Sequence, residues 1–202
     1  MAHFHMDGVL FKDVYGTPEM RDIFSGEQFI QRFLDVEAAL ARAEADVGLI
    51  PQSAAAEITE KATLDHVDFD DIEANVAEMH LFSMAIIDAW KDSMDEAGEY
   101  VHWGATTQDI FDTALVLQMR DGLDVIERDL DAVAEALEVL ADRYAETPMM
   151  GRTHQVHALP ITFGMKAATW LDEVNRNRER VAAMRERVEV VEFFGAVGTL
   201  SS

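Results

Sequence analysis

Apolar residues recur every three or four positions along most of this sequence, a spacing that predicts amphipathic α-helices. The longest such pattern covers residues 101–144 and contains no proline. We expect a single long bundle helix here, with the rest of the chain organised around it. Its apolar seam is Val116, Met119, Leu123, Ile126, Leu130, Val133, Leu137, Leu140 and Tyr144.

Three more helices are predicted before the long one. Residues 27–47 are amphipathic and end at Gly48, and residues 53–61 form a shorter helix. A third helix follows an acidic turn and stops before Gly98. Its apolar positions are Ile72, Val76, Met79, Ser83, Ile86 and Trp90. Residues 13–25 are expected to be irregular or a short helix around Pro18.

Residues 146–160 interrupt the pattern with two prolines and a glycine, so we expect an irregular polar connection. Another long helix should follow and pair with the first in antiparallel fashion. Its inward positions are Ala167, Trp170 or Leu171, Val174, Val181, Met184, Val188 and Val191. With no strand alternation in evidence, the predicted fold class is all-α.

Two domains are expected: an N-terminal helical domain at 1–98 and the start of a long-helix bundle at 99–202. Two paired helices leave apolar stripes uncovered, and the final GAVGTLSS has the composition of a glycine-rich turn. We therefore expect the bundle to be incomplete, with further helices from missing sequence or from other subunits.

The composition indicates where the chain is located and which kinds of site it can contain. It has 202 residues, 49% hydrophobic, and no apolar run near the roughly 20 residues of a membrane span. Residues 1–8 lack the basic flank and apolar core of a signal peptide, so a cytoplasmic location is expected. The absence of cysteine excludes disulfides, thiolate metal sites and cysteine nucleophiles.

The net charge is −23, from 39 acidic and 16 basic residues. No basic stripe is available to collect phosphates, so neither nucleic acid nor an anionic membrane is an expected partner. The acids are dispersed over helix faces, which argues against disorder. Acid-rich, lysine-poor surfaces of this kind resemble those of proteins from salt-loving organisms.

Polar residues gather at three places on the otherwise apolar helices. Thr106, Thr107 and Asp109 begin the long helix, where they are simplest to interpret as helix caps. The turn before them contains His102, and its backbone donors could hold an anion. The second place is His80, which alone is more often a boundary residue. The third is the run Arg152, Thr153, His154 and Gln155. These polar residues lie outside the predicted helices, which favours a functional role for them.

The segments HWGATTQDIFDT, GRTHQVHALPITFG and GAVGTLSS, in this order, resemble the aspartase/fumarase superfamily. The nearest branches are adenylosuccinate lyase and 3-carboxy-cis,cis-muconate cycloisomerase. The resemblance implies an all-α homotetramer whose active sites combine segments from three subunits. It also implies a reaction through a carbanion beside a carboxylate of a small substrate, with no cofactor and no metal.

The resemblance also assigns roles to residues. His154 matches the proposed general acid of the lyases, while His80 and His102 match histidines that contact the substrate. His154 and His80 are the expected catalytic residues, and His102 is expected to bind substrate. Thr106 and Thr107 match the hydroxyl pair that holds a substrate carboxylate. The neighbouring polar residues Gln108, Arg152, Thr153 and Gln155 are further candidates for substrate binding. The alternative role of Arg152 is to anchor its loop.

Several positions depart from the family pattern. Gln155 comes one place early, and Val14 replaces an arginine that precedes Tyr15 in adenylosuccinate lyases. The loop with the family's catalytic base would follow Ser202, so this chain alone is expected to be inactive.

The first expected function is a cycloisomerase; the alternatives are adenylosuccinate lyase and an inactive oligomerisation fragment. A di-iron site at Glu99 and His102 would need a second Glu-x-x-His copy, which the sequence lacks.

Overall fold

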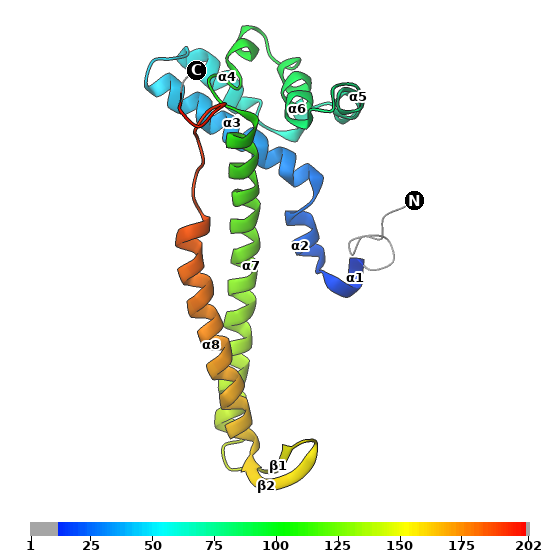
Figure 1. The fold of residues 1–202 in the computed structure, drawn as a ribbon, viewed down its shortest axis with the longest axis vertical. Helices are drawn as coiled ribbons and strands as arrows, with labels where there is room; N and C mark the ends of the chain where they lie inside the picture. Colours follow the sequence, from blue (N-terminus) through cyan, green and yellow to red (C-terminus); the bar gives the residue numbers. More distant parts are fainter. Residues whose placement is uncertain (1–11, 201–202) are drawn as a thin grey trace. The chain divides into compact units, whose positions relative to one another are not determined.

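A computed structural model of the chain describes residues 12–200. The segment tested for a signal peptide, residues 1–8, and the last two residues of GAVGTLSS lie outside this range. Within it the predicted all-α class is confirmed, with one small hairpin added (Figure 1). No described helix is both long enough and apolar enough to cross a membrane. The elements are α1 (Lys12–Tyr15), α2 (Pro18–Ile23), α3 (Gly26–Asp46), α4 (Gln52–Glu60), η1 (Leu64–His66), α5 (Phe69–Met79), α6 (Phe82–Lys91), η2 (Glu96–Tyr100), α7 (Thr107–Arg143), β1 (Pro148–Thr153), β2 (Val156–Thr162) and α8 (Phe163–Val188).

The chain forms two compact units. Unit 1 comprises the chain up to Met119 together with the segment from Glu189 onward, and unit 2 comprises Arg120–Val188. Helix α7 contributes its first turns to unit 1 and the remainder to unit 2. The predicted domain division between residues 98 and 99 stays a prediction.

The core of unit 1 is packed between α3, α4 and α6. Helix α3 begins where the Ser25 side chain accepts a hydrogen bond from the Gln28 amide, and its apolar face is buried at helical spacing. Trp90 is fully buried, and its indole Nε1 donates to the Lys61 carbonyl at 2.7 Å. The largest fully buried apolar side chains are Phe33, Leu34, Ile58, Ile86, Ile87, Trp90 and Ile110.

The single helix predicted to carry Ile72 through Trp90 is wrong, because the structure has two helices there. Helix α5 ends at Met79, and His80 adopts a left-handed conformation with φ 56°. The His80 amide donates to the Val76 carbonyl at 3.0 Å, which closes the helix end. Leu81 is extended, and α6 begins at Phe82. Apolar spacing continues through this break, so periodicity alone did not reveal it.

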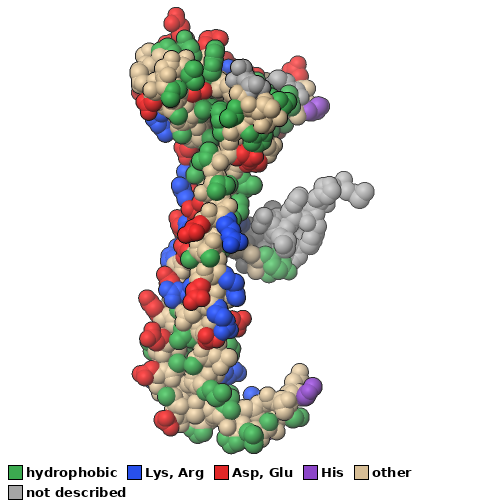
Figure 2. Space-filling model, turned by 60° about the vertical axis from the view of Figure 1, so that its left-hand side comes forward, with side chains coloured by type: hydrophobic (Ala, Val, Ile, Leu, Met, Phe, Trp, Pro, Cys, Tyr) green, Lys and Arg blue, Asp and Glu red, His purple; other side chains and the backbone are tan. Residues whose placement is uncertain are grey.

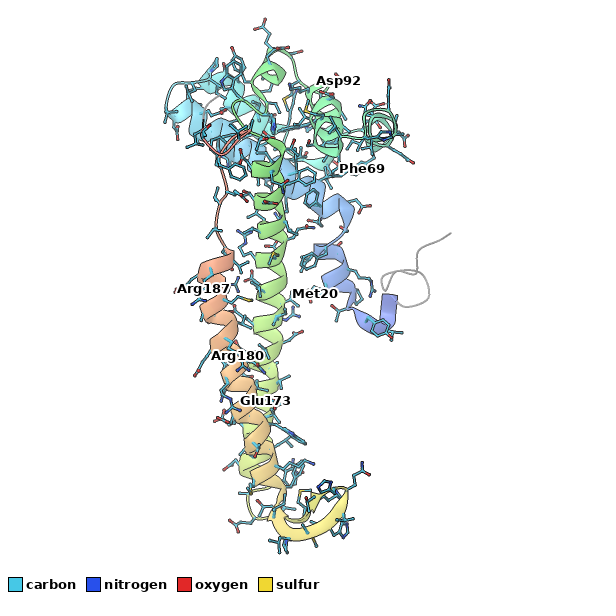
Figure 3. All side chains as sticks on the ribbon, in the orientation of Figure 1. Met20, Phe69, Asp92, Glu173, Arg180 and Arg187 are labelled. Carbon is cyan, nitrogen blue, oxygen red and sulfur yellow. The ribbon has the colours of Figure 1, made fainter. Side chains whose placement is uncertain are left out.

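Unit 2 confirms the predicted antiparallel pair of long helices. Arg185 on α8 pairs with Asp124 and Glu127 on α7, and Arg178 pairs with Asp131 at 2.6 Å. Figure 2 shows acidic and basic side chains interspersed along both helices. In Figure 3 the exposed residues Glu173, Arg180 and Arg187 lie along α8. Of the two alternatives for the inward position, Leu171 is half-buried while Trp170 is 43% exposed.

The irregular connection predicted at 146–160 is also wrong. Strands β1 and β2 form an antiparallel hairpin in which Pro148 pairs with Thr162 and Pro160 pairs with Met150. Proline has no amide hydrogen to donate, but a two-stranded ribbon consists of edge strands, where proline is tolerated. The prolines that led us to expect an irregular connection therefore fit this hairpin.

We predict that Gly164→Ala destabilises unit 2 by about 1–3 kcal/mol, because the site has no room for a methyl group. A Cβ at Gly164 would lie 2.5 Å from the Ala141 carbonyl oxygen and 2.6 Å from the Ala145 Cα. Gly26→Ala is the matched control, since nothing lies within 4 Å of a Cβ there. Urea unfolding of both variants measures the difference; equal stabilities would contradict the close α7–α8 approach.

Candidate active site

The turn that leads into α7, residues 102–107, is fixed by buried polar groups of unit 1. His102 adopts φ 63° and Gly104 adopts φ 68°, so the chain reverses through two left-handed positions before the helix starts. The carboxylate of Glu37, on α3, lies against this turn. Its Oε2 accepts from the His102 amide at 3.2 Å, and its Oε1 lies 2.6 Å from the ring Nδ1.

Asp109 holds the start of α7 together with the segment that follows α8. This side chain is 1% exposed. One of its oxygens accepts from the Thr106 amide at 3.0 Å and from the Gly195 amide at 3.1 Å, and the other accepts from the Phe194 amide at 2.9 Å. The motifs around Thr106 and GAVG, far apart in sequence, therefore meet at one buried carboxylate.

The two threonines are placed differently from the cap prediction. The Thr107 hydroxyl lies 2.9 Å from the hydroxyl of Ser83, a buried residue of α6. The half-buried Thr106 makes no side-chain hydrogen bond to any residue of the range 12–200, and Asp109 performs the capping instead. The interpretation of the threonine hydroxyls as caps is therefore wrong. Gln108 is exposed and donates to Asp112.

The second candidate group lies on the hairpin of unit 2. His154 and Gln155 form the two-residue turn between Thr153 and Val156, with φ values of 47° and 63°. Two successive left-handed residues are typical of the tight hairpin turn that usually takes asparagine and glycine. Arg152, Thr153, His154 and Gln155 are all exposed.

Left-handed backbone outside glycine coincides with the candidate residues. In the described part of the chain this conformation occurs at His80, His102, His154, Gln155 and Leu200. Such positions cost about 1–3 kcal/mol each and cluster at functional sites. Four of the five were singled out from sequence for their chemistry. At three of these the conformation also has a local structural reason, because His80 ends α5 and His154 with Gln155 forms the hairpin turn.

The structure brings some candidates together and separates others. His102, Thr106, Thr107 and Gln108 share one turn, and the exposed His80 lies three residues before the Ser83 that contacts Thr107. The group from Arg152 to Gln155 belongs to unit 2. The roles assigned to these residues stay predictions.

Sequence reasoning missed Glu37, Glu44 and Ser83. Glu37 and Glu44 are seven residues apart, so they lie on the buried face of α3 beside Phe33 and Ala41. Charged residues on an apolar face were the available signal. Ser83 was assigned to the apolar seam, although it is a buried hydroxyl that faces Thr107.

Burial raises the pKa of Glu44 from 4.5 to about 7, with a further contribution from the neighbouring Glu37 charge, while His102 acts in the opposite direction. One carboxyl oxygen of Glu44 has no hydrogen-bond partner among the described residues. Between pH 4.5 and about pH 7, the Glu44 carboxyl keeps its proton in the folded chain but has released it in the unfolded chain. Stability therefore falls as pH rises through this range, and the loss is complete above about pH 7.

We predict that Glu44→Gln raises the free energy of unfolding by about 2 kcal/mol at pH 8 and by little near pH 4.5. The amide keeps the shape of the side chain and removes the charge that burial disfavours. Urea unfolding at both pH values measures the effect. If the free energy of unfolding rises equally at both pH values, the ionisation of Glu44 is not the cause of the gain.

Comparisons with known proteins agree with this fold. The sequence profile of the lyase family matches residues 14–202. The chain is 45% identical to N-acetyl-S-(2-succino)cysteine lyase of Dickeya dadantii over all of this chain and 44% of that protein. It is 45% identical to adenylosuccinate lyase of Pyrococcus horikoshii over 93% of this chain and 42% of that enzyme.

A solved structure extends the comparison. The 3-carboxy-cis,cis-muconate lactonizing enzyme from Pseudomonas putida is 42% identical, with a TM-score of 0.89 over 95% of this chain and 44% of that one. The chain thus spans less than half the length of these relatives. The match over residues 14–202, the helical fold and the ordered motifs lead to one conclusion: the chain belongs to the lyase family, within the aspartase/fumarase superfamily.

Proposed function

We propose that the complete gene product containing this sequence eliminates fumarate from a small succinyl-bearing substrate. A base removes the proton on the carbon next to a carboxylate, and the carbanion is delocalised into that carboxylate. The bond from the neighbouring carbon to sulfur or nitrogen then breaks. The leaving group takes its proton from His154 and departs as a thiol or an amine.

The observation that carries this proposal is the turn at the start of α7. Thr106 offers a hydroxyl with no partner among residues 12–200, while Asp109 holds its backbone in place. Fixed donors placed where charge develops stabilise a carbanion without reorganisation. Thr106 and Thr107 are therefore proposed to bind the substrate carboxylate, with His102, Gln108 and His80 as neighbouring contacts.

The net charge of −23 does not prevent an anion from binding at this turn. Surface acids are screened beyond about 8 Å at physiological salt. A hydrogen bond to a charged group contributes about 1.5–3 kcal/mol, and a helix N-terminus adds about 0.3–1 kcal/mol. A few local donors therefore outweigh the distant charge.

The tight turn of the hairpin supports a proton-transfer role for His154. Its imidazole is exposed, and a histidine side chain can give a proton to a leaving group and recover it. Arg152, Thr153 and Gln155 are proposed to bind substrate beside it. As the resemblance to the superfamily implies, we propose that the site is assembled in a homotetramer from several subunits.

Fumarate release ranks first because the 45% identity to the succinocysteine lyase extends over the whole chain. Cycloisomerisation of a carboxymuconate, the first expectation from sequence, ranks second and is supported by the TM-score of 0.89 to the lactonizing enzyme. Adenylosuccinate is the least favoured substrate, because Val14 stands where an arginine would help hold a nucleotide.

Ultraviolet absorbance with each substrate tests the proposal. The complete gene product, assayed in molar salt, should form fumarate from N-acetyl-S-(2-succino)cysteine. Faster turnover of the carboxymuconate or of adenylosuccinate would reverse the ranking. If the complete gene product converts none of the three substrates, it has another function. If Thr106→Val and His154→Asn convert them as the wild type does, the roles proposed for these two residues are wrong.

A further inference from the structure

We propose that Glu37 is a positioning residue for His102: it holds Nδ1 as a hydrogen-bond donor, so that Nε2 is the ring nitrogen offered, as an acceptor, to a hydrogen-bond donor of the substrate. The part of this proposal that concerns a ligand rests on the proposed function. The part that concerns the tautomer rests on the structure of unit 1 alone.

Both carboxylate oxygens of Glu37 contact His102. Oε1 lies 2.6 Å from Nδ1 of His102, and Oε2 accepts from the His102 amide at 3.2 Å. An ionised carboxylate can only accept hydrogen bonds, so the proton of this contact must belong to Nδ1. The hydrogen bond made by one imidazole nitrogen decides the state of the other. Nε2, which contacts no hydrogen-bonding group of residues 12–200, is therefore the nitrogen left for a ligand.

The same contact explains why His102 can hold its backbone conformation. A left-handed residue other than glycine persists only where its surroundings over-determine it. Glu37 is 2% exposed and reaches both the amide and the ring of His102, so it constrains the backbone and the side chain together. This turn leads to Thr106, and the ring and the hydroxyls are therefore presented from one fixed segment.

Glu44 determines how much negative charge lies beneath this turn. It is 6% exposed on the same face of α3, and it favours its protonated form up to about pH 7 for the reasons given above. Of these two glutamates, Glu37 is the one that hydrogen-bonds to His102. Glu44 thus provides a matched control: a buried glutamate on the same helix that makes no hydrogen bond to the His102 ring.

The experiment has a spectroscopic arm on this chain. Long-range ¹H–¹⁵N spectra of ¹⁵N-histidine-labelled protein, assigned with His102→Gln, report which ring nitrogen carries the proton. We expect protonated Nδ1 in the wild type and in Glu44→Gln. In Glu37→Gln the amide can turn either its oxygen or its nitrogen to the ring, so the Nδ1-protonated population should fall. A wild-type ring protonated only on Nε2, or a pattern unchanged by Glu37→Gln, would overturn the proposal.

The second arm uses kinetics of the complete gene product. Glu37→Gln should raise KM for the carboxylated substrate by about tenfold with a smaller change in kcat, while Glu44→Gln leaves KM unchanged. An unchanged KM in Glu37→Gln, together with the altered tautomer, would overturn the claim that the ring binds the ligand. If the wild type acts on no carboxylated substrate, the proposed function fails, and the spectra still decide the tautomer.

Discussion

His154→Asn in the complete gene product should lower kcat by about 10²- to 10⁴-fold, the usual contribution of a general acid. Asparagine tolerates the left-handed conformation that His154 adopts, with φ 47°, but it cannot deliver a proton at neutral pH. The loss should therefore appear in kcat, whereas the hairpin should remain folded. Steady-state kinetics with the preferred substrate, combined with circular dichroism, measures both effects.

His157→Asn is the matched control for this variant. His157 is also an exposed histidine of the hairpin, but it lies within β2 and pairs with Arg152 across the ribbon. We expect its kcat to stay close to that of the wild type. Equal losses in the two variants would indicate a general effect on the hairpin and would remove His154 from the mechanism.

Asp109→Ala should produce the largest loss of local stability in unit 1. The substitution removes the acceptor for three backbone amides, those of Thr106, Phe194 and Gly195, at a site where the carboxylate is almost fully buried. Each unsatisfied buried group costs about 1–3 kcal/mol, so the three amides together give a total of about 3–9 kcal/mol. Hydrogen exchange at these amides should accelerate accordingly.

Asp112→Ala provides the comparison for Asp109→Ala. Asp112 lies one turn further along α7 and is only half-buried. Its side chain contacts Gln108, and its hydrogen bond with Glu192 raises the pKa of that glutamate. We expect much slower exchange at Phe194 and Gly195 in this variant than in Asp109→Ala. Protection of these amides in Asp109→Ala would show that Asp109 does not hold the segment.

Helical periodicity was sufficient to predict α3, α4, α7 and α8 to within a few residues, because each of these helices carries a continuous apolar stripe. The failures occurred where a single backbone conformation decides the structure. His80 ends α5 within an unbroken apolar spacing, and His154 with Gln155 closes a hairpin whose prolines led us to expect an irregular connection. These are left-handed residues that are not glycine, so composition gives no warning of them.

The chemistry of the candidate site was predictable only in part. Motif order and local polarity identified His102, Thr106, Thr107 and His154. The buried groups that orient them come from elsewhere in the chain: Glu37 acts on His102, and Ser83 contacts Thr107. Such partners lie on apolar helix faces, where the sequence pattern alone assigns them to the core.

We propose that hydroxyls at the start of α7 and the imidazole of the hairpin act in one active site built from different subunits. Mixing two inactive variants of the complete gene product, Thr106→Val and His154→Asn, tests it most directly. Each variant alone should have little activity, while mixed oligomers should regain part of the wild-type rate, because some sites then combine an intact hydroxyl with an intact imidazole. Mixed oligomers that form, as verified by mass spectrometry, and yet remain inactive would contradict the claim.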